Sequence, residues 1–447
     1  MTAAPLLAHP LTSIRTQHGW TLGEVAEIVA RRSGVNMAQG KQKVWRWEHR
    51  RAVPEMAAQL ALAAELKIPP CHVQKWSWPD WLHIAYGVEL ERPWDMHWAL
   101  MALMGSVDAA MDRRRFLTLS QESACALAGA WAIAPEQIVR GAFGRRVDPE
   151  VADWIETRIA ELWHLDDLVG GECCLDLAVS ELRLAIRLLS RGLYSGEVER
   201  RLYISAAELC RFAGWAAFDA GRHAAAERYW HAGLRAAATA AEPGVGAYIL
   251  SQMAMQRTYA GDGHGSVRLL KTAREKVGPG YSRTVHAMLD AWQVRAHAVA
   301  GEAREAARVL LQADGHWGRR HPEEDPPWIY WMRRPSTTIE VGMAFARLGQ
   351  PETAEELISD GMAERTSDYE RDRVLGWTAI ALARLDQGEV DGALTAGRQA
   401  AAAAASIDSS RVLDEMDAFT SRLPGKEREV FKAEIDAIMK PSPTDAE

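Results

Sequence analysis

The sequence predicts an all-α protein that begins with a small helical unit and continues as a long solenoid of helical hairpins. Two observations carry this prediction. A helix-start motif and a second short helix with one apolar face follow each other between residues 21 and 54. From residue 205 onward, single glycines recur at nearly constant spacing, each after a helical stretch. Such a period is how stacked helix pairs show themselves in a sequence.

The first helix of the N-terminal unit is expected to begin after Thr21. The Thr21 hydroxyl can accept from a free N–H group of the first turn, and Glu24 can reach back to Thr21, which is the reciprocal arrangement of a capping box. Trp20 and Val25 stand where a hydrophobic staple clamps the entry. Apolar residues at helical spacing then give the helix one buried face: Leu22, Val25, Ala26 and Val29.

A second helix, over about residues 41–48, follows a turn that contains Gly34 and Gly40. Val44 and Trp47 are its expected apolar anchors. A helix that reads DNA needs one buried face to fix its angle, and polar residues that reach base edges. The positions expected on the DNA-facing side, together with two arginines just beyond the helix, are Lys41, Gln42, Lys43, Trp45, Arg46, Arg50 and Arg51.

These seven residues have different expected roles. Glutamine can pair with adenine, and arginine or lysine with guanine, so base contacts are expected from Gln42, Lys43 and Arg46. Phosphate contacts are expected from Lys41, Arg50 and Arg51. Trp45 packs either on the DNA or between helices of the unit, and Glu48 is expected to orient neighbouring arginines. A purely structural three-helix cap with a solvated basic face remains the alternative.

The N-terminal unit resembles the helix-turn-helix domains of phage-repressor (xenobiotic-response-element, XRE) type. The resemblance rests on Leu11, Arg15, Trp20, Leu22, Ala26, Val44, Arg46, Trp47, Glu48 and Pro54. It implies binding to double-stranded DNA through the second helix. One departure is Arg50, which stands where that family usually has a glycine.

Length and charge are compatible with a DNA-binding head on an acidic body. The 447 residues suggest about two to four domains, and the net charge is −8. Residues 1–80 hold ten Lys and Arg against six Asp and Glu, a balance of +4, so the rest carries −12. A chain of this kind can bind DNA through its head alone. The expected domains are a helix-turn-helix unit at 9–70, a helical connector at 71–204, a repeat array at 205–405, and capping helices with a tail at 406–447.

The repeat array is defined by Gly221, Gly261, Gly301, Gly349 and Gly388, at steps of 40, 40, 48 and 39 residues. Five residues after each glycine comes a small residue: Ala226, Ser266, Ala306, Ala354 and Ala393. Glycine can turn the chain sharply between two helices, and a small residue lets those helices approach closely. The pattern resembles tetratricopeptide repeats, with longer periods than usual. An ordinary helical bundle is the alternative.

The connector and the C-terminal end are also expected to be helical. Amphipathic helices are predicted at 153–160, 175–189 and 197–210, and a solvating end helix between Ser410 and Met439. The order of head, Trp78-Pro79-Asp80-Trp81-Leu82 junction, Asp112-Arg113-Arg114-Arg115-Phe116-Leu117 helix and Gly214–Gly221 repeat resembles actinobacterial regulators. Those pair an XRE-type head with a tetratricopeptide sensor, which implies transcriptional control through an effector or partner.

Two places in the array are candidates for binding that effector. One is the long segment from Asp314 to Arg334, rich in aromatic and arginine side chains, which is either a ligand site or a loop held down by its own aromatics. The other is one face of two successive helices, which is either an inner wall or ordinary core. The candidate residues are Tyr248, Gln252, Gln256, Tyr259, Trp292, Arg295, Trp317, Trp328, Tyr330 and Trp331.

Several classes of protein are not indicated. No nucleophile–base set, glycine-rich phosphate loop or metal-ligand spacing appears, so we expect no enzyme, no cofactor and no metal. No apolar run is long enough to cross a membrane, and the cytoplasm is the expected compartment. The acidic runs Asp166-Asp167 and Glu323-Glu324-Asp325 are expected at the solvated surface. We expect a homodimer that senses a small molecule, a peptide or a protein. The alternative is an interaction scaffold with an idle head.

Overall fold

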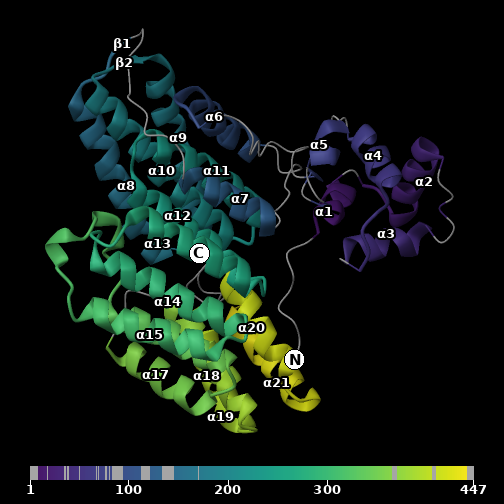
Figure 1. Ribbon diagram of the computed structural model, residues 1–447. Helices are drawn as coiled ribbons and strands as arrows, with labels where there is room; N and C mark the ends of the chain where they lie inside the picture. The colour runs from purple at the N-terminus through teal and green to yellow at the C-terminus, as the bar shows by residue number, and fades with distance from the viewer. Residues whose placement is uncertain are drawn as a thin grey trace, which may run out of the picture.

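The computed structural model describes residues 9–17, 19–34, 37, 40–49, 51–66, 68, 70–75, 78–79, 81–82, 94–111, 121–132, 145–169, 171–364, 370–404 and 409–439. Within these ranges the chain is almost entirely helical, which confirms the all-α prediction (Figure 1). The exception is a two-residue parallel pair, β1 (Arg145–Arg146) with β2 (Gly192–Leu193). None of the described helices is long and apolar enough to cross a membrane.

The N-terminal unit consists of α1 (Pro10–Gln17), α2 (Leu22–Ser33), α3 (Gly40–Glu48), α4 (Met56–Glu65) and α5 (Pro70–Lys75) and projects from one side of the larger part (Figure 1). The expected capping box of α2 is present. Thr21 Oγ1 accepts from the Glu24 N–H at 3.2 Å, and Glu24 Oε2 accepts from the Thr21 N–H at 2.6 Å. The small core of the unit contains Leu11, Ile14, Val25, Val29, Val44, Trp47 and Leu62.

Two glycines shape the turn between α2 and α3. Gly34 ends α2 in the left-handed conformation, with φ of 70°, which a glycine adopts without steric cost. A Cβ atom on Gly40 would lie 2.5 Å from the Cβ atom of Ala26, so α3 can start against α2 only because this position has no side chain. This close contact restricts the angle between α2 and α3.

The larger part is built from consecutive helical hairpins. They are α10 (Gly196–Asp219) with α11 (His223–Thr239), α12 (Pro243–Tyr259) with α13 (Gly263–Val277), α14 (Arg283–Val299) with α15 (Ala303–Trp317), α16 (Arg334–Arg347) with α17 (Pro351–Ala363), and α18 (Glu370–Asp386) with α19 (Val390–Ala404). The final pair is α20 (Ser410–Arg422) with α21 (Gly425–Met439). Short 3-10 turns, η2 (Pro322–Glu324) and η3 (Pro327–Ile329), lie between α15 and α16.

The glycine series marks the hairpin turns. Each of the five glycines lies between the two helices of one hairpin, with φ between 70° and 82°. The small residues that follow them are buried, with no more than 3% exposed. Four residues after the small residue the first four hairpins have a large apolar side chain (Trp230, Leu270, Leu310 and Ile358), but the fifth has Gly397, where Phe419 and Phe431 of the last helix pair fill the space. A Cβ atom there would lie 2.6 and 2.8 Å from their rings.

Ala241 is the one described residue other than glycine with positive φ, at 52°, and it turns the chain between α11 and α12. Its turn repeats the hydrogen bonds of the glycine turns, with Ala241 N–H donating to Ala238 O and Glu242 N–H donating to Ala237 O. We expect Ala241→Gly to raise the free energy of unfolding by about 0.5–1 kcal/mol, since relief of left-handed strain exceeds the added chain entropy. Urea denaturation measures this, and a loss of stability would contradict the strain.

The connector helices belong to the larger part. α6 (Met96–Met111) packs on α9 (Gly171–Arg191) and α11, while α7 (Gln121–Ala132) packs on α13. Trp131 of α7 sits against Gly246, where a Cβ atom would lie 2.1 Å from the indole. The predicted helices at 153–160, 175–189 and 197–210 are present within α8 (Pro149–Val169), α9 and α10. α10 runs through residue 204, where we expected the connector to end. The Asp112–Leu117 motif lies outside the described residues.

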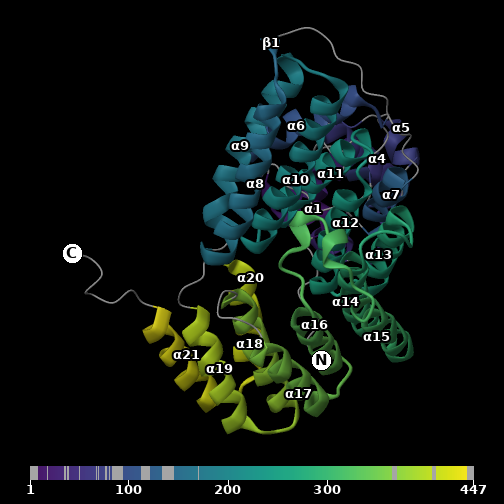
Figure 2. The same ribbon diagram turned by 90° about the vertical axis from the view of Figure 1, so that its left-hand side faces the viewer.

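The array curves back on itself, so that its late helices reach its early ones. Figure 2 shows α18 and α20 beneath the lower end of α8. Arg371 of α18 binds Asp166 of α8, with Nη2 and Oδ1 3.2 Å apart, and Arg411 of α20 donates to Asp219 of α10 at 3.1 Å. These residues are about two hundred positions apart in the sequence. The curvature therefore encloses a space between the first helices of successive hairpins.

Candidate functional site

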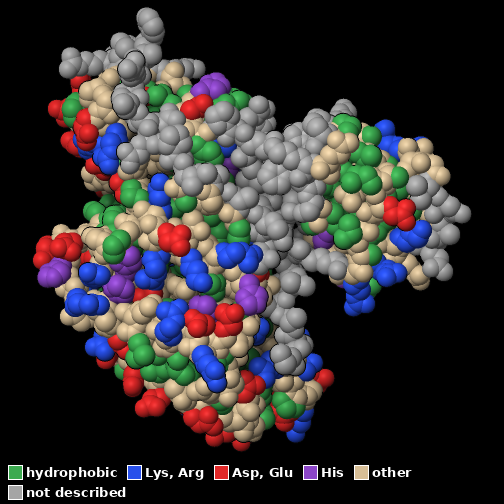
Figure 3. All heavy atoms as spheres, viewed as in Figure 1, with side chains coloured by type: hydrophobic (Ala, Val, Ile, Leu, Met, Phe, Trp, Pro, Cys, Tyr) green, Lys and Arg blue, Asp and Glu red, His purple; other side chains and the backbone are tan. Residues whose placement is uncertain are grey.

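The helix α3 presents two different faces. Val44, Trp47 and Glu48 are buried against the rest of the unit. On the opposite side Lys41, Gln42, Lys43, Trp45 and Arg46 are exposed, as the sequence predicted. Figure 3 shows lysine and arginine side chains along this edge of the N-terminal unit. The exposed face of α3 thus has three cationic side chains and no acid.

An ion pair on the buried side of α3 holds this helix against α1. Glu48, with 3% of its side chain exposed, accepts from Arg15 of α1 through both oxygens, at 2.7 Å from Nε and 3.2 Å from Nη2. Arg15 also donates to the carbonyl of Trp20 at 3.1 Å. Glu48 does bind an arginine, as expected, but the partner lies in α1 rather than beside it in α3. The carboxylate is used inside the unit and is not directed at a base.

Trp45 is exposed, which excludes the alternative that it packs between helices. The residue is 37% exposed, and its ring stacks on His49 at a centroid distance of 4.1 Å. The Arg51 guanidinium lies 5.0 Å from the centre of the ring. Trp45 and Arg51 therefore form one surface at the C-terminal end of α3. Arg50, the seventh candidate, lies outside the described residues.

A cavity lies on the concave side of the array. Its internal volume is about 130 Å³. Because a water-sized site takes roughly 10–15 Å³ of such volume, there is room for on the order of ten non-hydrogen atoms. The walls come from the first helix of each hairpin and from α8, and the segment after η3 covers one side. Prominent polar and aromatic residues of the lining are Trp163, Asp166, Asp167, Arg211, Trp215, Tyr248, Gln252, Trp292, Trp328, Tyr330, Trp331, Glu340, Arg371, Asp372 and Arg411.

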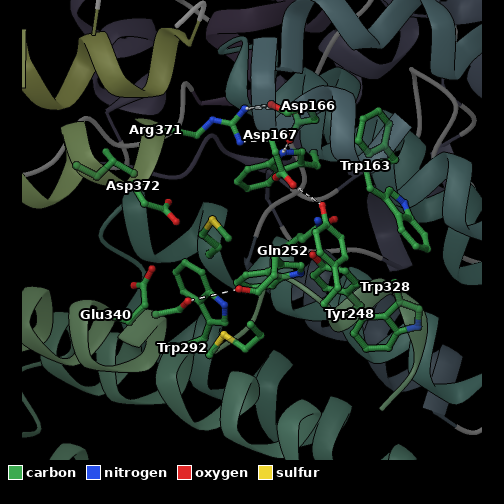
Figure 4. Close-up of a pocket in the computed structure, with 18 of the residues that line it drawn as sticks. Trp163, Asp166, Asp167, Tyr248, Gln252, Trp292, Trp328, Glu340, Arg371 and Asp372 are labelled. Atoms are coloured by element: carbon green, nitrogen blue, oxygen red, sulfur yellow. Dashed lines mark hydrogen bonds and ion pairs between the residues drawn. The ribbon is translucent and has the colours of Figure 1, made fainter. Parts of the chain in front are cut away.

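The two places predicted as separate binding candidates meet in this one cavity. Tyr248, Gln252 and Trp292 of the inner wall line it, together with Trp328, Tyr330 and Trp331 of the long segment. The Tyr248 ring stacks on Trp328 at 4.7 Å and on Trp331 at 6.1 Å. Figure 4 shows Tyr248 and Trp328 side by side at one wall, with Trp292 at another.

The other four predicted residues are not among those that line the cavity. Gln256 donates to the carbonyl of His223 at 3.2 Å, and Trp317 donates to Thr337 at 3.0 Å. The Tyr259 hydroxyl accepts from Arg411 at 3.2 Å. Arg295 pairs with Glu340 at 2.8 Å, so it holds a lining residue from behind. These four residues serve to position the walls.

The segment from Asp314 to Arg334 is also held in place by its own contacts. Arg320 donates to Asp325 at 2.8 Å, and Asp325 accepts from Ser282 at 2.6 Å and from Thr284 at 2.8 Å. The first half of this segment is therefore held by polar contacts within itself and to the start of α14, rather than by its own aromatics as expected. Its second half lines the cavity.

Asp167 lines the cavity and has a hydroxyl group rather than a guanidinium group as its hydrogen-bond partner. Its Oδ2 accepts from the Tyr330 hydroxyl at 2.6 Å, and no ion pair with a lysine or arginine is found for it among the described residues. Burial raises the pKa of Asp167 to about 6. The nearby charge of Asp166 also raises this pKa, whereas the hydrogen bond from Tyr330 and the charges of Arg371 and His164 lower it. A half-buried carboxylate with this environment favours a cation nearby.

The expectation that the two acidic runs are solvated surface is wrong for Asp166 and Asp325, whereas Glu323 and Glu324 are exposed as expected. Asp166 is 6% exposed and accepts from Trp215 Nε1 at 3.0 Å, in addition to its ion pair with Arg371. Asp325 has 9% of its side chain exposed. Sequence reasoning misjudged them because most of their partners lie far away in the chain: Trp215 and Arg371 for Asp166, and Ser282 and Thr284 for Asp325.

A comparison of the sequence with family models and with curated proteins found no match to either. Among the described residues, no group of three or more His, Cys, Asp or Glu side chains is arranged to hold a metal ion. The chemistry of the two sites must therefore be argued from their own residues.

Proposed function

We propose that this protein is a sequence-specific DNA-binding transcriptional regulator whose repeat array senses a small molecule. The observation that carries the proposal is α3, with one face buried by Val44 and Trp47 and the other offering Lys41, Gln42, Lys43 and Arg46 to solvent. This division is what a recognition helix in the major groove requires. The resemblance to XRE-type heads and tetratricopeptide sensors supports the same function.

The ion pair between Arg15 and Glu48 supports the DNA-binding part. Residues that contact bases must be held at a defined angle, and a two-point guanidinium–carboxylate pair resists rotation better than a single contact. Arg51, which lies over the Trp45 ring, extends the exposed face beyond the end of α3. A single recognition helix covers few base pairs, so the proposal includes a homodimer on two half-sites.

The closure of the array supports the sensing part. The cavity is lined by α8 and α10 on one side and by α16, α18 and α20 on the other. A ligand there touches early and late helices together, so it binds the closed arrangement better than an open one. A ligand shifts an equilibrium only by such a difference in affinity. We propose that this shift changes the spacing of the two heads.

Binding of the purified protein to a fragment of its own promoter, measured across a salt series, tests the function. Specific binding whose affinity falls steeply with salt is expected, because phosphate contacts release counterions. Equal affinity for unrelated DNA of the same length would instead favour the alternative of an interaction scaffold with an idle head.

Arg46→Ala is expected to cost about 1–3 kcal/mol of specific DNA affinity, because Arg46 is proposed to contact a base.

Lys41→Ala, at a proposed phosphate contact, is expected to weaken binding to all sequences and to lower the salt slope by about one. Arg304→Ala is the matched control, since Arg304 is exposed on α15 and the substitution changes the charge equally. Titration of operator and unrelated DNA separates the three variants, and equal losses for Arg46→Ala and Arg304→Ala would exclude a base contact.

A further inference from the structure

The guanidinium groups around the cavity are already bound to carboxylates. Arg211 donates to Glu208 at 2.9 Å, and both side chains are buried. Arg371 binds Asp166 and lies 3.3 Å from Asp219, which also accepts from Arg411. An anionic ligand would have to compete with these buried pairs for their arginines.

Among the described residues, carboxylates outnumber guanidinium groups around the cavity. The carboxylates in its lining and in direct contact with its arginines are Asp166, Asp167, Glu208, Asp219, Glu340 and Asp372. The guanidinium groups in the same shell are Arg211, Arg295, Arg371 and Arg411. Figure 4 shows Glu340 and Asp372 pointing toward one another across the cavity. This balance favours a cation inside.

The rest of the cavity lining suits a ligand that is mostly apolar and makes one polar contact. Aromatic rings and the side chains of Met255, Met343 and Leu375 form most of the surface. Gln252 accepts from Trp230 Nε1 at 3.0 Å through Oε1, which turns its amide nitrogen away from Trp230. Among the described residues no partner is found for that nitrogen, so it can donate to a ligand.

We propose that the cavity binds an organic cation, a protonated amine carried on an aromatic or apolar body of about ten non-hydrogen atoms, with Asp167 as the residue that receives the ammonium group. An ammonium group has three donors and no acceptor, so it matches a carboxylate whose other contact is a single hydroxyl. Aromatic walls add cation–π attraction. Only the identification of this amine as the effector of the regulator rests on the proposed function.

The pH dependence follows from the surroundings of Asp167. Asp166, Arg371, His164 and Tyr330 influence its charge, and burial raises its pKa to about 6. The ionised form binds a cation, so affinity for the amine should fall as the pH drops through about 6.

Three probes that share a phenylethyl body test the proposal by calorimetry on the full-length protein: phenethylamine, 2-phenylethanol and 3-phenylpropionate. Phenethylamine should bind at least about tenfold more tightly than the alcohol, as expected for a hydrogen bond to a charged group, and the carboxylate should not bind. Equal binding of amine and alcohol, tighter binding of the carboxylate, or no binding of the amine at millimolar concentration would each overturn it.

Asp167→Asn assigns the ammonium contact. It should raise the dissociation constant for phenethylamine about 10- to 100-fold, leave binding of 2-phenylethanol unchanged, and abolish the pH dependence near 6. Asp176→Asn is the matched control, because Asp176 is exposed on α9 and the chemical change is the same. An equal effect of both variants on the amine would overturn the assignment to Asp167. A melting temperature equal to or above that of the parent protein shows that Asp167→Asn is folded.

The two proposals can fail separately. Promoter binding in the salt series without amine binding would overturn the cation site and leave the regulator. Amine binding without specific DNA binding would leave the cation site and overturn the regulator.

Discussion

Replacing Asp219 with alanine is expected to lower the free energy of unfolding by about 3–5 kcal/mol, because it leaves buried guanidinium groups without their shared carboxylate. Asp219 is fully buried near the end of α10 and accepts from Arg411 at 3.1 Å, while Arg371 lies 3.3 Å away. Arg371 retains Asp166 in the variant. Among the described residues, Arg411 then keeps one hydrogen-bond partner, the neutral Tyr259 hydroxyl. Urea denaturation measures the loss.

A surface pair provides the control for this substitution. Asp386 pairs with Arg422, and each side chain is 39% exposed. Asp386→Ala should therefore cost less than about 1 kcal/mol, since exposed ion pairs contribute little. Asp219→Asn separates charge from size and should lose most of the stability that the alanine variant loses. If Asp219→Ala and Asp386→Ala were equally mild, the buried network would not be what closes the array.

The same substitution has a predicted local consequence. Asp219 joins α10 to α18 and α20, and these helices line opposite sides of the cavity. Amide hydrogen exchange in α20 should accelerate more than in α12 when this junction is lost. Uniform acceleration over the whole array would show that the ion pairs stabilise the fold without holding its two ends together.

The hairpins could be predicted because their signals are local. Each turn needs a residue with positive φ, and each close helix contact needs a small residue, so glycine and alanine appear at fixed spacing. The capping box of α2 is equally local. The faces of α3 follow from its helical period, which explains why its exposed residues could be named before its surroundings were known.

The cavity could be predicted only in part, because its walls meet through the curvature of the array. Tyr248 and Trp328 were each expected at a binding site, but nothing in the sequence shows that they stack on one another. The ion pairs between α8 and α18 join residues that have no shared pattern. Asp219 did offer a signal, since an acid between Phe218 and Ala220 interrupts an otherwise apolar repeat motif.

Gly214→Ala is expected to destabilise the protein by about 2–4 kcal/mol, although alanine is the better helix former. A Cβ atom on Gly214 would lie 2.2 Å from Nε1 of Trp230, whose side chain is fully buried. The indole cannot move aside without losing its hydrogen bond to Gln252, which lines the cavity. The variant should therefore also weaken binding of phenethylamine.

Gly105→Ala is the matched control, because Gly105 is exposed within α6 and a Cβ atom there meets nothing within 4 Å. It should stabilise the protein by about 0.5–1 kcal/mol. Opposite signs in urea denaturation would show that contact with Trp230, rather than helix propensity, keeps this glycine in place, whereas stabilisation by both would contradict it.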